Sequence, residues 1–180
     1  MSSLIVYGDF NCPYTRLASA RMAVLEERGS ASFDFRAVEH DPGIPERGEP
    51  VTGDIRDMFE RELEQLTGLL RQGERNPLRL PSLRVNTRRA TEAYASVDPA
   101  GRAGVREQIF RSYWEDDRDI SDPAVLEALG VRGQASAPAW VWQEEWDGLP
   151  TMVPLMILPD GHVSKGLGVL ERLGDQVESA

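Results

Sequence analysis

Apolar and polar positions change their spacing several times along the chain, and each change predicts a different element. Residues 4–7 form a short β-branched and aromatic run, and residues 13–28 carry an apolar content typical of a helix. Phe33, Phe35 and Ala37 then alternate with polar residues, as in a half-buried strand. The first 40 residues therefore predict strand, helix and strand, with parallel strands joined by a right-handed crossover.

A helical section is expected after a loop rich in proline and glycine. In the tryptophan-rich stretch 137–146 the apolar residues have no clear helical or strand spacing, and Pro138 favours a helix start. Asp122 and Pro123 resemble a capped helix start. Helices are expected over 55–70, 82–97 and 105–114, and a short one between 122 and 130.

Strand patterns return near the end of the chain. Residues 152–158 are apolar, 159–161 form a turn signal, and 162–166 can pair back as a hairpin. A last apolar helix follows from residue 167. The order is strand–helix–strand, a helical block, then strand–strand–helix, which suggests an insertion into one domain.

Composition narrows the class of protein. The chain has 180 residues and a net charge of −10, which argues against nucleic acid or an anionic membrane as a partner. A single cysteine excludes an intramolecular disulfide and cysteine-rich zinc sites, and we expect no metal site. Neither a membrane-spanning run nor a signal peptide is visible, so a cytoplasmic location is expected.

Cys12 carries the strongest chemical signal. It stands at the entrance of the first helix, where free N–H groups and the helix dipole favour a thiolate. Cys12, Pro13, Tyr14 and Thr15 have the spacing of a Cys-x-x-Cys motif, with a hydroxyl in place of the second sulfur. The Thr15 hydroxyl could donate to the Cys12 sulfur. The alternative is a buried, inert cysteine.

The charged residues around Cys12 give weaker indications. A carboxylate at Asp9 would raise the pKa of the thiol, but a solvated turn position is favoured for it. Arg16 either favours the thiolate or faces water. His40 and His162 are far apart, and the sequence does not indicate a Cys–His pair.

Two further clusters admit two interpretations each. Four arginines could receive substrate carboxylates, although a solvated helix face is favoured: Arg79, Arg84, Arg88 and Arg89. Several aromatic residues could line a cleft over Cys12, although a place in the helical core is favoured: Phe59, Trp114, Trp140, Trp142 and Trp146.

The segment from Asp9 to Thr15, between a strand and a helix, resembles the active-site segment of DsbA-like proteins in the thioredoxin superfamily. This branch includes FrnE-type oxidoreductases, 2-hydroxychromene-2-carboxylate isomerases and kappa-class glutathione transferases. The resemblance implies an α/β thioredoxin-like domain, residues 1–45 and 149–180, with an inserted helical domain, 46–148. It also implies a cis-proline facing the cysteine, and Val153-Pro154 fits that place.

The sequence departs from the oxidoreductases because Thr15 replaces the second cysteine. A mixed disulfide on Cys12 would then need an external thiol to resolve it. The resemblance makes Cys12, Thr15 and Pro154 the candidate catalytic residues. Pro13, Tyr14 and Val153 become candidate substrate contacts.

Three functions follow from this resemblance. The first is a thiol–disulfide oxidoreductase with a single activated cysteine. The second is a thiol-dependent isomerase or glutathione transferase-like enzyme, and the third is a catalytically silent binding module. The expected partners are a thiol or disulfide substrate, protein or small molecule, and a second copy in a homodimer. No tightly bound cofactor is expected, with glutathione or another low-molecular-weight thiol as the candidate ligand.

Overall fold

The structure, a computed structural model, describes residues 3–131 and 137–178 and is built around a four-stranded sheet. The strand order is β2-β1-β5-β6. β1 pairs parallel with β2, while β5 pairs antiparallel with both β1 and β6. This confirms the predicted parallel pair and the hairpin near the end of the chain. The strands are β1 (Ser3–Gly8), β2 (Ser32–Ala37), β5 (Leu155–Ile157) and β6 (Val163–Lys165).

The first crossover helix, α1 (Pro13–Glu27), follows β1 closely. Pro13 begins it, since its missing N–H would have no partner in the first turn. Arg28 caps its end, and Gly29 adopts a φ of 67° at the next position, as the predicted stop requires. A Cβ at Gly8 would lie 2.3 Å from Thr15 Cγ2, so this glycine allows the end of β1 to approach the first turn of α1.

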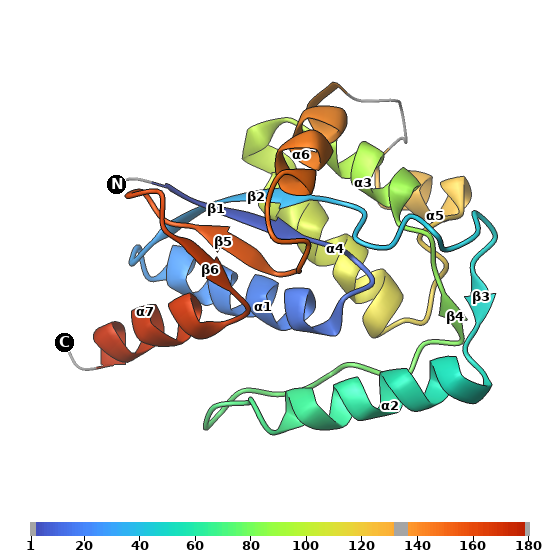
Figure 1. Cartoon of the computed structure of the whole chain (residues 1–180), viewed down its shortest axis with the longest axis horizontal. Coiled ribbons are helices and arrows are strands. Elements are labelled where there is room, and N and C mark those ends of the chain that lie inside the picture. The colour runs from blue at the N-terminus through green and yellow to red at the C-terminus, as the bar shows by residue number, and fades with distance from the viewer. Residues whose placement is uncertain (1–2, 132–136, 179–180) are drawn as a thin grey trace.

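Helices cover both faces of the sheet. Figure 1 shows α1 and α7 below the sheet and α3 and α6 above it. α4 lies against both α1 and α3. The remaining helices are α2 (Gly53–Thr67), α3 (Arg88–Ala95), α4 (Arg102–Trp114), α5 (Pro123–Ala128), α6 (Ala137–Asp147) and α7 (Gly168–Glu178), with a short 3-10 helix at Pro99–Gly101.

The helix expected over 82–97 is wrong in its first part. Leu83 and Arg84 form β4 and pair antiparallel with β3 (Glu49–Pro50). The Asn86 amide then donates to the Ile44 carbonyl oxygen at 2.8 Å, and the helix begins only at Arg88. These long-range bonds override the local helical pattern of residues 82–87. The same pairing places a short strand, β3, in the loop expected over 41–53.

An aromatic cluster joins the sheet to α3 and α4. Phe10 and Phe35 contact each other, and each also contacts Tyr94 and Phe110, with ring centroids between 4.9 and 6.2 Å apart in tilted or edge-to-face arrangements. The buried apolar side chains form one continuous cluster that includes residues from 1–45, 46–148 and 149–180. The division into a thioredoxin-like part and an inserted helical part therefore stays a prediction.

The tryptophans of α6 divide between core and surface. Trp142 and Trp146 are buried, as the core interpretation requires, whereas Trp140 is 59% exposed. Within the described ranges, none of the helices is long and apolar enough to cross a membrane.

Candidate active site

The loop between β1 and α1 is held by two contacts from distant parts of the chain. The buried Trp114 indole N–H donates to the Phe10 carbonyl oxygen at 2.9 Å. The Asn11 amide donates to the Val85 carbonyl oxygen at 3.1 Å. Because these contacts fix the residues directly before Cys12, the position of the cysteine backbone depends on segments far away in sequence.

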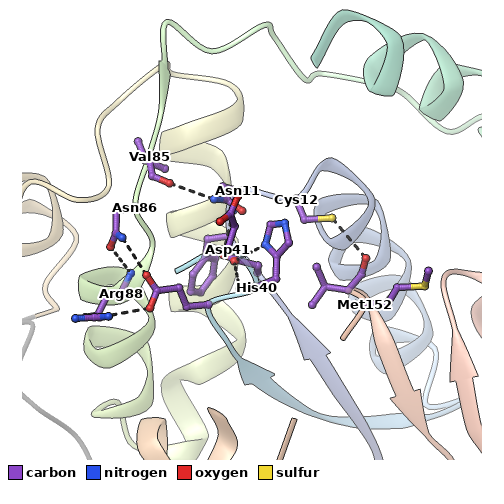
Figure 2. A network of polar contacts seen from close by, with 12 residues as sticks. Asn11, Cys12, His40, Asp41, Val85, Asn86, Arg88 and Met152 are labelled. Carbon is purple, nitrogen blue, oxygen red and sulfur yellow. Dashed lines mark hydrogen bonds and ion pairs between the residues drawn. The ribbon is translucent and has the colours of Figure 1, made fainter. Parts of the chain in front are cut away.

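Cys12 occupies the N-cap of α1, as predicted, and lies against the segment before β5. Its side chain is buried, and its S–H donates to the Val153 carbonyl oxygen at 3.7 Å. Figure 2 shows this contact beside Met152. The peptide bond between Val153 and Pro154 is cis. The structure thus brings together three of the predicted site residues, Cys12, Val153 and Pro154.

The protonation of Cys12 differs from the sequence expectation. Burial raises the pKa of the Cys12 thiol to about 11. The Thr15 hydroxyl and the first amides of α1 act in the opposite direction, and the negative charge of Asp9 adds to the rise. The S–H donor to Val153 also requires the thiol, since a thiolate would be repelled by the carbonyl oxygen. The expected activated thiolate is therefore not the resting state.

The three residues that follow Cys12 in the motif, Pro13, Tyr14 and Thr15, differ in their contacts. Thr15 is fully buried, and its hydroxyl has no hydrogen-bond partner at normal geometry among the described residues. The Tyr14 hydroxyl donates to Gln65 Oε1 on α2 at 2.9 Å, which ties the two helices together. Pro13 lines a small cavity with Cys12. The roles predicted for Thr15, Pro13 and Tyr14 stay predictions.

Asp9 and His40 form a pair that sequence reasoning missed. Asp9 is 0% exposed, so its expected solvated position is wrong. Its Oδ2 accepts from the His40 backbone N–H at 2.8 Å and lies 2.7 Å from His40 Nδ1. Burial lowers the pKa of His40, but the hydrogen bond and charge of Asp9 outweigh it and leave that pKa raised. The available signal was that both residues follow the carboxyl ends of adjacent parallel strands.

Arg16 does not act on Cys12. It is buried and forms two hydrogen bonds to the Glu107 carboxylate, at 2.5 and 2.7 Å, and one to Glu115 at 2.8 Å. Its charge is therefore neutralised by α4 and the residue after it. Both sequence interpretations, a thiolate partner or a water-facing side chain, are wrong.

The arginine cluster is distributed among separate ion pairs. Arg84 pairs with Asp41 and with Glu49, the latter at 3.1 Å. Arg88 pairs with Glu39 at 3.4 Å, as Figure 2 also shows. Arg88 and its neighbour Arg89 are exposed at the start of α3, in agreement with the solvated helix face that the sequence favoured, whereas Arg84 lies on β4 and belongs to no helix face.

Two cavities meet at His40. The smaller has a volume of about 70 Å³ and lies between the start of α1, α2 and β4. It is lined by Asn11, Cys12, Pro13, His40, Met58, Phe59, Glu62 and Arg84. The larger, of about 440 Å³, lies between His40, α3 and α6. In the part of the chain that the structure describes, no group of three or more His, Cys, Asp or Glu side chains could hold a metal ion.

Comparison with solved structures supports the thioredoxin-like architecture. A "probable DsbA oxidoreductase" from Streptomyces coelicolor aligns with a TM-score of 0.72 at 17% identity, covering 98% of this chain and 88% of the other. A 2-hydroxychromene-2-carboxylate isomerase aligns at 0.64 and 22% identity, covering 99% and 95%. The cytosolic disulfide reductase DsbM from Pseudomonas aeruginosa, solved with GSH, aligns at 0.57 and 18% identity, covering 99% and 98%.

At these identities the likeness concerns the fold alone. No curated protein matches the chain. The family profile of the DSBA-like thioredoxin domain matches residues 3–140, which is more than half of the sequence and includes the loop and helix that carry Cys12. The chain therefore belongs to the DSBA-like thioredoxin domain family.

Proposed function

We propose that the protein is a thiol–disulfide oxidoreductase in which Cys12 is the only cysteine nucleophile. One observation carries the proposal: Cys12 Sγ lies at the N-terminus of α1 and 3.7 Å from the carbonyl oxygen directly before the cis-proline Pro154. A disulfide brought to this point would meet a sulfur, the positive end of a helix and an extended backbone together. Membership of the DSBA-like family supports the same reaction class.

The reaction proceeds by two thiol–disulfide exchanges. The Cys12 thiolate attacks one sulfur of the substrate disulfide, whose S–S bond breaks and releases one half as a thiolate. Cys12 is left in a mixed disulfide, which Thr15 cannot resolve because a hydroxyl does not attack disulfides in this way. An external thiolate, glutathione or another low-molecular-weight thiol, attacks the mixed disulfide and frees the Cys12 thiolate.

The larger cavity is the proposed place for the rest of the substrate. Its volume of about 440 Å³ lies in the range of small-molecule sites. The exposed Trp140 offers an aromatic face, and the Glu92 and Asp147 carboxylates line the same cavity. This lining suits a substrate that carries an apolar or aromatic group beside a positive charge.

The first experiment follows reduction of a glutathionylated peptide by the wild-type protein and by Cys12→Ala. Wild type is expected to release glutathione and to show a mixed disulfide by intact mass, and Cys12→Ala neither. Because the chain holds one cysteine, no second thiol can take over. Full activity in Cys12→Ala would overturn the proposal.

A second variant separates substrate binding from chemistry. Trp140→Ala removes the aromatic face of the larger cavity without touching Cys12. We expect a higher KM for a substrate that occupies the cavity and an unchanged rate of Cys12 alkylation by iodoacetamide. An unchanged KM for every disulfide tested would remove the cavity from the proposal.

A thiol-dependent isomerase or transferase is the second candidate. The observation in its favour is that Cys12 rests as a thiol with a pKa of about 11, so a bound cofactor thiol could perform the chemistry instead. This function predicts that glutathione raises the melting temperature of Cys12→Ala as well as of wild type. If Cys12 reacts with neither disulfides nor iodoacetamide and no small thiol binds, the silent binding module is the remaining interpretation.

A further inference from the structure

The resting state of Cys12 leaves a gap in the proposed reaction. The attacking species in thiol–disulfide exchange is the thiolate. In the structure the sulfur is instead a hydrogen-bond donor to Val153 O, and its side chain is almost fully buried. Some group near Cys12 must therefore take its proton or stabilise the negative charge that remains.

Arg16 is unsuited to this task because two carboxylates already surround its guanidinium. Arg84 lines the small cavity with Cys12, but it is held by Asp41 and Glu49. Glu62 also lines the cavity and carries the wrong charge to stabilise a thiolate. The remaining ionisable side chain of the lining is His40.

His40 is held in one orientation by Asp9. The carboxylate oxygen Oδ2 contacts both the backbone N–H and the ring Nδ1 of His40, and Oδ1 accepts from the Asn11 backbone N–H at 3.4 Å. A proton on Nδ1 is thereby fixed, and the second ring nitrogen, Nε2, lies on the opposite side of the ring from this bond. Asp9 is fully buried, while the His40 side chain is 35% exposed.

Cys12 and His40 face the same small cavity. Both line the cavity of about 70 Å³ at the start of α1, and in Figure 2 the His40 ring lies beside Cys12. A cavity of this size can hold water and gives the Cys12 side chain room to turn away from Val153. The cavity thus lies between a thiol and an imidazole, and the buried Asp9 carboxylate holds that imidazole from outside the cavity.

We propose that Cys12, His40 and Asp9 form a thiol-activation site, in which the Cys12 proton passes to His40 Nε2 and leaves a thiolate beside an imidazolium. The proposal rests on the proposed function, because it names the group that activates its nucleophile. The step conserves protons: thiol and neutral imidazole become thiolate and imidazolium, and Asp9 stays a carboxylate. Substrate backbone that bonds to Val153 O would release the sulfur from its resting contact.

The surroundings of His40 favour the charged pair. The raised pKa of His40 means that the imidazolium persists to higher pH than for a free histidine. Asp41 adds to that rise and Arg84 opposes it. The charged and titratable groups that face His40 from the neighbouring elements, across its two cavities, are Asp9, Asp41, Glu62, Arg84, Glu39, Arg88, Glu92 and Asp147.

The test measures the second-order rate constant of Cys12 with iodoacetamide and with 2,2′-dithiodipyridine from about pH 5 to pH 10. Wild type, His40→Gln and Asp9→Asn are compared. An opposite charge within a few ångströms lowers a pKa by about one unit or more, so His40→Gln should react at least tenfold more slowly at neutral pH. Its profile should keep a single rise at alkaline pH. Asp9→Asn should lower the pKa of His40, followed by NMR, because it removes the hydrogen bond and the charge that raise it.

His162→Gln is the matched control, since His162 is the only other histidine and is exposed on the hairpin turn. Its profile should superimpose on that of wild type. A folded His40→Gln protein whose profile also superimposes on wild type would overturn the proposal. Alkylation of Cys12 requires no catalytic turnover, so the two proposals can fail separately. If the pH profile of alkylation depends on His40 but the protein does not reduce the glutathionylated peptide, the proposed function is refuted and this inference stands.

A second measurement needs no substitution. The ring resonances of His40 are followed by NMR up to alkaline pH in the wild-type chain before and after Cys12 is blocked as a methyl disulfide. Because burial raises the pKa of Cys12 to about 11, the thiol ionises well above the pH at which a histidine titrates, and a thiolate that forms beside the ring should then shift the His40 resonances in a second step. Blocking should remove that second step. A wild-type chain without a second step at His40 would overturn the proposal even if His40→Gln failed to fold.

Discussion

Replacing Thr15 with valine should stabilise the protein and weaken its thiol chemistry at the same time. The side chain is fully buried, and its hydroxyl has no partner among the described residues. Valine has nearly the same shape and exchanges only the hydroxyl for a methyl group. Leaving a buried hydroxyl unsatisfied costs about 1–3 kcal/mol, so Thr15→Val should raise the free energy of unfolding by about 1–2 kcal/mol.

The stability change is measurable in two ways. For a domain of this size about 1 kcal/mol shifts the melting temperature by roughly 2–4 °C, so calorimetry should show a clear rise. Urea unfolding should move its midpoint without a change in slope. Thr15→Ser is the control: it keeps the hydroxyl, loses one buried methyl group and should be less stable by about 0.8 kcal/mol.

The chemical effect runs in the opposite direction. The Thr15 hydroxyl has no partner while Cys12 is a thiol that donates to Val153 O, but it lowers the pKa of that thiol because it can donate to the thiolate. Thr15→Val should therefore raise the pKa of Cys12 further and slow its alkylation at neutral pH, whereas Thr15→Ser should not. A lower melting temperature for Thr15→Val would refute the reasoning, because it would mean that the hydroxyl has a partner in solution. An unchanged pH profile of alkylation would show that Thr15 does not influence the sulfur.

Three other outcomes follow from the same structure. Because burial raises the pKa of Cys12 to about 11 in the folded state, urea unfolding at pH 9 and pH 10 should show that Cys12→Ala loses about 1 kcal/mol less unfolding free energy than wild type between these two values, and an equal loss would contradict it. Gly8→Ala would place a Cβ 2.3 Å from the Thr15 side chain and 2.7 Å from that of Phe35, so urea unfolding should show a destabilisation of about 1–3 kcal/mol, and an equal midpoint would contradict it. Trp114→Phe leaves a buried carbonyl before α1 without its donor, and calorimetry should record a loss of about 1–3 kcal/mol.

The order of elements could be predicted because local signals agreed with tertiary contacts. Pro13 and Gly29 bracket the first helix, and the Asp122 carboxylate accepts from the Ala124 backbone N–H, which is the expected cap. The error at residues 82–87 arose where long-range contacts decide the conformation. There the pairing of β3 with β4 and the side-chain bonds of Asn86 replace a helical turn that the local pattern allowed.

The sequence predicted those features of the candidate site that depend on residues close together in the chain. The position of Cys12, its place at a helix start and the proline before β5 all follow from local sequence. The burial of Cys12 does not follow from local sequence. Burial raises the pKa of the thiol, whereas the position at a helix N-terminus alone suggested a lowered pKa. The pairing of Asp9 with His40 joins residues 31 positions apart, and only the adjacency of β1 and β2 brings them together.

The anchors of the loop before Cys12 have a consequence for how this chain can be divided. Val85 and Trp114, which hold Asn11 and the Phe10 carbonyl, both come from the segment between the two halves of the sheet. That segment is thus a scaffold for the cysteine as well as a cover over the sheet. A shortened protein that joined the two halves directly could keep its strands and still misplace the sulfur, so attempts to engineer a minimal version should graft these two anchors first.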